Sequence, residues 1–278
     1  DADLKGRFAS LNRRNVSAFC KKLGVSENVF FLTAYNLSIG LFSNEKDTVS
    51  SSIHSGRTDS RWNRLAGPLF LTYFFRNKEG VDQTVPELLK TNATQIMDTM
   101  RCYISNLHAD EMFFQYQGDI LNIDTVGGYP AERQRMQLDS LPFHLQVFTD
   151  AKGYYYELRY WENRFDTRQL QDFLTVMESL MDAMQEETLV RRLGRRLPDR
   201  QFPLHYTITV EELNQAAKCQ LVTGVDGKEP VKVYVFDENC RKKPFGAWGE
   251  LYVMDYKPEQ VLDEITNPYG PGKLYDSG

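Results

Sequence analysis

Helix-start signals alternate along this chain with short runs of β-branched and aromatic residues. Thr84-Val-Pro-Glu87 is a capping box with a proline in the first turn, and an apolar stripe extends the predicted helix from Pro86 to about Ser105. Asp166 is the predicted N-cap of a second helix, which also has an apolar stripe. Two further helices are predicted, one from Asn12 to Leu23 and one after Ser26. Because each helix must bury one face, the chain has to fold in layers.

The segments between these helices have the composition of strands. Strands are predicted at Thr48–His54, Leu69–Arg76, Met112–Gln117, Phe143–Thr149 and Tyr154–Trp161. The segment Asp150-Ala-Lys-Gly153 joins the last two as a hairpin. Strands that alternate with amphipathic helices predict a layered α/β domain.

The regular spacing of apolar residues ends after Glu187, where five arginines surround Pro198. A basic run of this kind is usually a solvated connector rather than a binding patch. The predicted organisation is therefore an α/β domain over residues 1–187, a basic linker over 188–203 and a second unit over 204–278.

The second unit is small and mostly β. Thr209 opens a short helix with Glu212 at the capping-box position, and strand-like runs follow at Val231–Phe236 and Glu250–Met254. A unit of this size is marginal on its own unless it docks on the first.

The composition excludes several kinds of partner. The 278 residues carry a formal net charge of -5 and the 33 basic residues are mostly scattered, so no nucleic-acid footprint is visible. The longest apolar stretch, Val29–Phe42, is too short to cross a bilayer. The four separated cysteines show neither metal spacing nor a disulfide framework, which favours the cytoplasm. The polar start without methionine is typical of a segment of a longer chain.

The histidines give no metal site. His54, His108, His144 and His205 are isolated, with no HExxH or Cys-His spacing. His54 ends a predicted strand and could act as an acid or base, but a lone histidine there is more often a structural hydrogen-bonding residue. His144 lies inside a predicted strand, and packing is the better interpretation for it.

Motifs for nucleophilic hydrolysis and phosphate binding are missing from the sequence. It contains no GxSxG elbow, Walker loop or glycine-rich dinucleotide fingerprint. Ser50-Ser-Ser52 could be a nucleophile cluster or a phosphate loop, but its strand context favours a row of hydroxyls that lines a groove.

A longer motif lies in the first half of the chain. The eleven residues from Ala66 to Arg76 line up without gaps on the pattern IGxFVNTxxxR. Gly67, Thr72 and Arg76 match it, and Leu71 replaces the asparagine.

Two shorter motifs flank it. Gly56-Arg57 closes a segment similar to GxxxxGR, and Phe114-Gln-Tyr-Gln117 is similar to fNyQ. On these motifs, residues 8–184 resemble the C-terminal lobe of nonribosomal peptide synthetase condensation domains, which are relatives of chloramphenicol acetyltransferase. The resemblance implies an α/β fold in which helices pack on a mixed sheet.

The resemblance also implies a function. Condensation domains form amide bonds between carrier-bound aminoacyl or peptidyl thioesters, in a tunnel between two lobes. The histidine of their HHxxxDG motif belongs to the preceding lobe, which is absent here, so the chain alone is expected to be inactive. It would supply the acceptor-side wall, with the N-terminal lobe and a peptidyl carrier protein as partners. The carrier protein would bring phosphopantetheine, and the chain itself would bind no cofactor. The candidate tunnel residues are Ser50, Ser52, His54, Gly56, Arg57, Thr72 and Arg76.

The second unit has its own resemblance. Val233-Tyr-Val-Phe-Asp237, Gly249-Glu-Leu-Tyr252 and Lys273-Leu-Tyr-Asp-Ser-Gly278 are similar to parts of synthetase adenylation domains. The ribose-binding aspartate of that family would follow Gly278, and its phosphate loop has no counterpart here. The unit is therefore expected to be a truncated, mostly β platform that cannot activate amino acids alone. Its motif residues are Asp237, Gly249, Glu250 and Tyr275.

Two other functions stay open. The chain could be a noncatalytic interdomain scaffold or carrier-protein docking module, which would bind a carrier protein with or without phosphopantetheine. It could also be a diverged acyltransferase that uses His54 or His144 as a base.

Overall fold

The computed structural model resolves the chain into two units. One comprises Asp1–Gly40 and Lys46–Leu193, and the other comprises Leu41–Glu45 and Gly194–Gly278; we call them unit 1 and unit 2. The structure describes residues 2–55, 61, 67, 69–80, 82–101, 111–118, 125–126, 128–130, 141–186, 189–196, 205–217, 220–237, 243, 247–254, 264–267 and 271–276.

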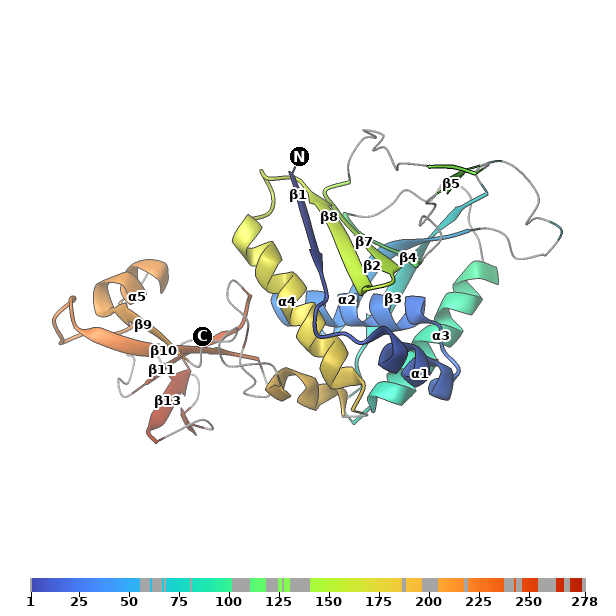
Figure 1. Cartoon of the computed structure of the whole chain (residues 1–278). Helices are drawn as coiled ribbons and strands as arrows, with labels where there is room; N and C mark the ends of the chain where they lie inside the picture. Colours follow the sequence, from blue (N-terminus) through green and yellow to red (C-terminus); the bar gives the residue numbers. More distant parts are fainter. Residues whose placement is uncertain are drawn as a thin grey trace. The chain divides into compact units, whose positions relative to one another are not determined.

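The described strands of unit 1 form a six-stranded mixed sheet. The strands are β1 (Ala2–Arg7), β2 (Asp47–His54), β3 (Leu71–Lys78), β4 (Met112–Gly118), β7 (Phe143–Asp150) and β8 (Gly153–Tyr160). Their order is β1-β8-β7-β4-β2-β3 (Figure 1). β4 runs parallel to both β2 and β7, and the other neighbours are antiparallel. A small separate pair, β5 (Thr125–Val126) and β6 (Tyr129–Pro130), completes the described strands of this unit.

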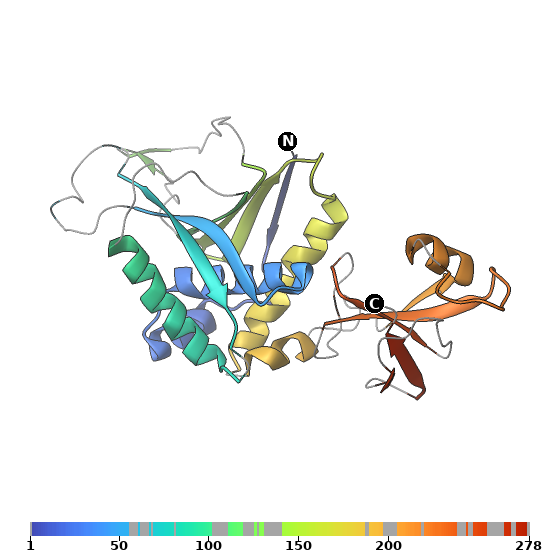
Figure 2. The same cartoon turned by 180° about the vertical axis from the view of Figure 1, so that it is seen from behind.

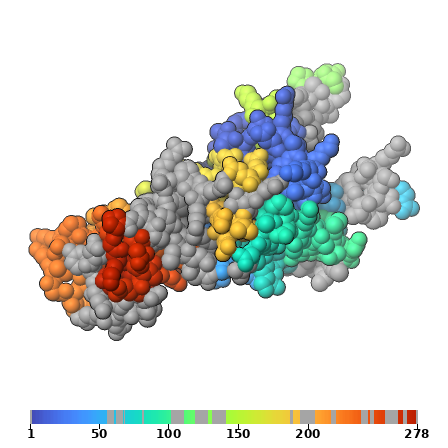
Figure 3. Space-filling model, turned by 90° about the horizontal axis from the view of Figure 1, so that it is seen from below, coloured from blue at the N-terminus to red at the C-terminus, as the bar shows by residue number. Residues whose placement is uncertain are grey.

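The helices of unit 1 pack on one face of this sheet. They are α1 (Arg13–Leu23), α2 (Glu27–Ser43), α3 (Val85–Arg101) and α4 (Thr167–Met184). Figures 1 and 2 show the helices and the sheet as two layers, and in Figure 3 α1, α3 and α4 lie next to one another on the surface. The predicted α/β layering is confirmed.

Aromatic side chains make the core between the two layers. Tyr35 of α2 lies 5.1 Å from Phe114 and 6.0 Å from Phe143, measured between ring centroids, and Phe173 of α4 lies 5.6 Å from Phe143. Every residue of α2 from Val29 to Ser38 is buried, because the helix lies between the sheet and its neighbouring helices. The prediction that this helix is central to the core is confirmed.

A buried polar network crosses the same interface. The amide nitrogen of Asn36 donates to Ser50 Oγ at 2.8 Å, and the hydroxyl of Thr48 donates to the Asn36 side-chain oxygen at 3.3 Å. The amide nitrogen of Asn92 on α3 donates to Asn77 Oδ1 at 2.9 Å and, on α2, to Thr33 Oγ1 at 3.0 Å. These bonds satisfy polar groups that would otherwise be costly to bury.

The predicted helix starts are confirmed in atomic detail. The backbone nitrogen of Glu87 donates to Thr84 Oγ1 at 3.4 Å, and the Thr84 backbone nitrogen donates to Glu87 Oε2 at 2.9 Å. Asp166 caps α4 by accepting from the backbone of Gln169 at 2.9 Å. Asn12 caps α1 in the same way. Each cap satisfies amides that have no partner within their own helix.

Strand β1 is an edge strand that the sequence did not predict. It pairs with β8 from Ala2 opposite Tyr160 to Arg7 opposite Tyr155. At Gly6 a Cβ atom would lie 2.3 Å from the Tyr156 hydroxyl, so only glycine leaves room for this phenol. The pairing of β1 therefore depends on a contact with a residue about 150 positions away.

Unit 2 contains a five-stranded antiparallel sheet. Its strands are β9 (Tyr206–Thr209), β10 (Pro230–Phe236), β11 (Glu250–Met254), β12 (Glu264–Thr266) and β13 (Lys273–Asp276), in the order β12-β13-β11-β10-β9. Helix α5 (Val210–Ala217) covers one face, where Leu213 packs with Val231, Val233 and Val253. Tyr234, Phe236, Tyr252 and Leu274 form a second buried cluster.

The first part of the predicted basic linker is folded. Val190–Arg196 forms the 3-10 helix η2, in which Val190 and Leu193 are buried. The backbone nitrogen of Val190 donates to Gln83 O at 3.0 Å, and Arg191 pairs with Asp82 at 3.2 Å. The segment is therefore not solvated throughout, because two apolar residues three apart fall on one side of a 3-10 helix.

Candidate functional site

The face of the sheet opposite the helices is the candidate site. Successive residues of a strand point to opposite faces, so alternate positions of each strand build this surface. Among the described residues, no helix packs on it (Figure 2). We call it the helix-free face. It comprises Asp3, Lys5, Arg7, Ser51, Ile53, Thr72, Phe74, Arg76, Phe113, Gln115, His144, Gln146, Phe148, Tyr155, Glu157 and Arg159.

Strand register aligns these side chains in rows. The first, which we call the histidine row, runs from Ser51 through Phe113, His144 and Arg159 to Asp3. The rings of His144 and Phe113 meet edge to face, with centroids 4.8 Å apart. Burial, and secondly the Arg159 charge, lower the pKa of His144 to about 4, so the imidazole is neutral near pH 7.

The next row, which we call the glutamine row, consists of Gln115, Gln146, Glu157 and Lys5. The amide nitrogen of Gln146 donates to Gln115 Oε1 at 2.9 Å. Lys5 Nζ lies 3.8 Å from Glu157 Oε1. The row therefore presents two carboxamides bound to each other beside an ion pair.

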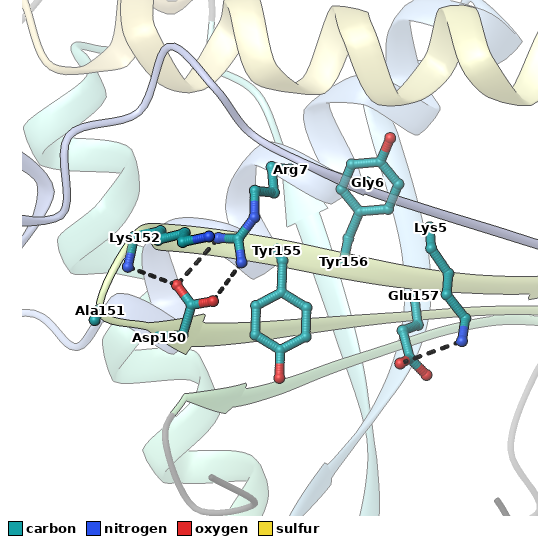
Figure 4. A pocket seen from close by; sticks show the side chains of 9 residues that line it. All are labelled: Lys5, Gly6, Arg7, Asp150, Ala151, Lys152, Tyr155, Tyr156 and Glu157. Atoms are coloured by element: carbon teal, nitrogen blue, oxygen red, sulfur yellow. Dashed lines mark hydrogen bonds and ion pairs between the residues drawn. The ribbon is translucent and has the colours of Figure 1, made fainter.

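The third row lines an open pocket at the β1 end of the face. The rings of Phe148 and Tyr155 stack with centroids 5.0 Å apart, and the Arg7 guanidinium lies 5.5 Å from the Tyr155 centroid. Arg7 Nη1 donates to Asp150 Oδ1 at 3.0 Å, and this pairing lowers the pKa of Asp150. The pocket has a volume of about 620 Å³ (Figure 4). It is lined by Lys5, Gly6, Arg7, Asp150, Ala151, Lys152, Tyr155, Tyr156 and Glu157.

Ser50 and Ser52 do not line a groove. Their exposed fractions are 0% and 1%, and both belong to the face of β2 that α2 covers. Ser51, which lies between them, belongs to the helix-free face and is also buried, with 0% of it exposed. The groove interpretation is corrected for these two residues, because strand alternation turns them into the core.

The other predicted tunnel residues are dispersed. His54 ends β2 half-buried, and burial lowers its pKa. Thr72 lies on the helix-free face opposite Ile53. Arg76 lies four residues further along β3, where its Nε donates to Asp47 Oδ1 at 2.6 Å on the exposed surface. Gly56 and Arg57 lie outside the described residues.

Three of the four motif residues in unit 2 lie together. Asp237 follows β10 and is buried, while Gly249 precedes β11 and Glu250 begins it, with Glu250 opposite Phe236. A Cβ on Gly249 would lie 2.5 Å from Phe236 O, so the close approach requires glycine there. Tyr275 lies further along the sheet, opposite Val253.

The sequence interpretation missed the glutamine row. Its four residues come from β1, β4, β7 and β8, and only the register of these strands brings them together. The alternation of polar and apolar residues in Tyr154–Trp161 was a usable signal for the face, but nothing local gives the strand order. The face therefore becomes visible only in the fold.

The described residues also limit the chemistry. Among them, no group of three or more histidine, cysteine, aspartate or glutamate side chains could hold a metal ion. The helices in this part of the chain are all too short or too polar to span a membrane.

Several solved structures of nonribosomal peptide synthetases are similar to this chain in fold. The holo form of AB3403, a four-domain nonribosomal peptide synthetase bound to AMP and glycine, matches 68% of this chain with a TM-score of 0.59 and 14% identity. The first condensation domain of the calcium-dependent antibiotic synthetase, in complex with a substrate analogue, matches 68% with a TM-score of 0.51 and 8% identity. The synthetase FmoA3, bound to α-methyl-L-serine-AMP, matches 83% with a TM-score of 0.52 and 12% identity.

These matches concern the fold. The chain covers 17% of the four-domain synthetase, 46% of the condensation domain and 30% of FmoA3, so it spans less than half of each. No protein-family model and no curated protein matches the sequence. The mixed α/β architecture predicted for unit 1 is confirmed as condensation-domain-like.

Proposed function

We propose that the chain contributes the acceptor-side half of a condensation domain, which forms amide bonds between carrier-bound aminoacyl or peptidyl thioesters. The observation that carries this proposal is the fold of unit 1, a mixed sheet with helices on one face. It is similar to a condensation domain at a TM-score of 0.51 and to a four-domain nonribosomal peptide synthetase at 0.59. Coverage of 46% of one such domain agrees with a contribution of about half.

In the proposed reaction, the amine of the acceptor attacks the carbonyl carbon of the donor thioester. A C–N bond forms, the C–S bond breaks, and the amine proton ends on the departing thiol. The N-terminal lobe would supply the HHxxxDG histidine, and a peptidyl carrier protein would bring the acyl group on phosphopantetheine. The helix-free face would be the wall that this chain supplies, because it offers hydrogen-bonding side chains without a covering helix.

The low pKa of His144 supports a wall that binds the reactants without supplying a general base. An imidazole with a pKa of about 4 is a weak base near pH 7, and its Nε2 is buried with no hydrogen bond to any residue in the described part of the chain. Burial lowers the pKa of His54 as well. An acyltransferase that uses either residue as its base is therefore the weaker hypothesis, and unchanged turnover after His54→Ala or His144→Ala would remove it.

We assign unit 2 the role of an adenylation-like platform that does not activate amino acids alone. The close approach of Gly249 to β10 gives a structural reason for the Gly-Glu-Leu-Tyr motif. The match to FmoA3 extends over 83% of the chain, which is more than unit 1 comprises. Both observations agree with the role, which rests on the motif resemblance.

Carrier-protein binding tests the proposed function. The purified chain is titrated with holo and apo carrier protein, alone and with a separately made N-terminal lobe, and affinity and dipeptide formation are measured. Tighter binding of the holo form and dipeptide formation after reassembly support the catalytic half-domain. Equal binding of both forms without product overturns it and supports the alternative, a noncatalytic docking module.

A further inference from the structure

Strand β3 is an edge strand of the six-stranded sheet, and its register with β2 shows which of its backbone groups point outward. The backbone nitrogen of Glu79 donates to Lys46 O at 2.9 Å, one position beyond the last pair of β2 and β3. In an antiparallel pair, positions that exchange hydrogen bonds alternate with positions whose N–H and C=O groups point to the other side of the strand. Every second residue of β3 therefore faces away from β2 with both groups: Thr72, Phe74, Arg76 and Lys78. No residue in the described part of the chain bonds these groups.

The two edges of the sheet differ in how well they are protected from pairing with another strand. By the same alternation, each outward-facing position of β1 carries a charged side chain, and such charges discourage pairing: Asp3, Lys5 and Arg7. On β3, the first two outward-facing positions are Thr72 and Phe74, and Arg76 is neutralised by its ion pair with Asp47. β3 also contains no proline or glycine, and its register with β2 runs from Leu71 to Lys78 without a bulge. β3 is therefore the edge on which another strand can pair.

Exposed apolar side chains gather beside this edge. Of the five large apolar side chains that are exposed in the described part of the chain, three lie on or next to β3, and they are 45% to 58% exposed. Phe70 directly precedes β3, Val49 lies on β2 opposite Arg76, and Met97 lies on α3, which runs beside β3 (Figures 1 and 2). Apolar side chains that are exposed together are typical of an interface with another protein.

A second copy of the same strand is complementary to this edge. In an antiparallel pair centred on Phe74, the Phe74 residues of the two copies lie opposite each other, and Thr72 of each copy lies opposite Arg76 of the other. Every outward backbone group then meets an outward group of the second copy, the two rings form an aromatic cross-strand pair, and no like charges are opposed. A register centred on Arg76 would instead place two guanidinium groups opposite each other. The chemistry of the edge thus favours pairing with itself around Phe74.

We propose that β3 is an interface at which two copies of this chain pair edge to edge, in an antiparallel register centred on Phe74. The sheets of the two copies join into one across a two-fold axis, so each contact occurs twice. This inference goes beyond the proposed function, because it concerns the outer edge of β3 and no step of the reaction. The two proposals therefore stand or fall separately.

The oligomeric state of the full chain in solution tests the interface. Analytical ultracentrifugation is expected to show a monomer that converts into a dimer as the protein concentration rises from roughly 1 to 100 μM. A wild-type chain that stays monomeric throughout overturns the proposal. If a separately made N-terminal lobe then binds the wild type but not Thr72→Pro, the edge accepts a strand of that lobe instead of a second copy.

Proline and alanine at the same position test whether the backbone of β3 forms the interface. Thr72→Pro removes an outward N–H in each copy and no bond to β2, and strands tolerate proline where the N–H faces away from the sheet. Because two intermolecular hydrogen bonds are lost, dimerisation should weaken about tenfold or more. Thr72→Ala keeps the N–H and is the matched control, which should dimerise like the wild type. Circular dichroism verifies that both variants are folded, and equal dimerisation of the two overturns edge pairing.

Opposite charges at Phe74 test the register and do not depend on proline. Phe74→Lys and Phe74→Glu each place like charges opposite each other across the two-fold axis, so each variant alone should be monomeric at concentrations at which the wild type is dimeric. An equimolar mixture of the two variants places opposite charges there, and a heterodimer is expected. Two folded variants that form no heterodimer in the mixture contradict the register centred on Phe74.

Discussion

The two faces of the six-stranded sheet come from the same strands but use their side chains differently. On the helix-covered face, Tyr35, Phe114, Phe143 and Phe173 pack ring to ring, and the buried amides are hydrogen-bonded. On the helix-free face, polar and charged side chains alternate with a few aromatic rings. The difference indicates that aromatic packing concentrates stability on the helix-covered face, whereas the other face combines buried residues such as Ser51 and Phe148 with polar side chains.

The largest expected effect comes from the helix-covered face. Phe143→Ala removes a buried ring that contacts Tyr35, Phe165 and Phe173, and we expect it to lower the free energy of unfolding by about 3 to 5 kcal/mol. Urea denaturation measures this loss. The control is Thr72→Ala on the helix-free face, which should cost less than about 1 kcal/mol. Equal losses would remove the distinction between the faces.

The buried amide network should show the next largest effect. Asn36→Ala leaves Ser50 and Thr48 without their side-chain partner in the core, and we expect a loss of about 2 to 3 kcal/mol in the same measurement. Asn15→Ala on the exposed side of α1 is the matched control and should stay within about 0.5 kcal/mol of the wild type. A loss no larger than that of the control would show that the network contributes little.

The histidine row should make stability depend on pH. The folded-state pKa of His144 is about 4, below its ordinary value of 6.5, so between these values the unfolded chain binds more protons and stability falls as pH falls. We expect the wild type to lose roughly 3 kcal/mol in this window relative to His144→Gln. Urea denaturation at pH 7.5, 6, 5 and 4 measures the difference. Parallel curves for the two proteins would contradict it.

The smallest effect is expected at the exposed edge of the helix-free face. Arg76 pairs with Asp47 where both side chains reach solvent, so Arg76→Gln should leave the unfolding midpoint unchanged within error. Thermal unfolding followed by circular dichroism measures it. A clear drop would mean that this edge contributes to stability and would weaken the contrast between the faces.

The sequence predicts the elements that have local signals. Thr84 with Glu87 and Thr209 with Glu212 form the expected capping boxes, and the hairpin from Asp150 to Gly153 is present. Caps and tight turns depend on residues within a few positions of one another, so one stretch of sequence contains the whole signal.

The sequence could not predict the elements that depend on distant partners. β1 contains no β-branched or aromatic residue and forms because β8 lies beside it. For Ser50 and Ser52, the alternating pattern is visible, but the side on which α2 packs decides which serines are buried. For these two residues, the sequence therefore predicted a groove where the structure has the core.

The pairing of β1 with β8 means that β1 cannot pair until β8 has been synthesised. The partner of β1 is made about 150 residues after it, so at roughly 5 to 20 residues per second β1 waits on the order of ten seconds or more on the ribosome. During that time its backbone amides are unpaired, and its charged residues Asp3, Lys5 and Arg7 would discourage pairing with other nascent chains. Among the described strand pairs of the six-stranded sheet, β1 and β8 are thus the pair with the largest separation in the sequence.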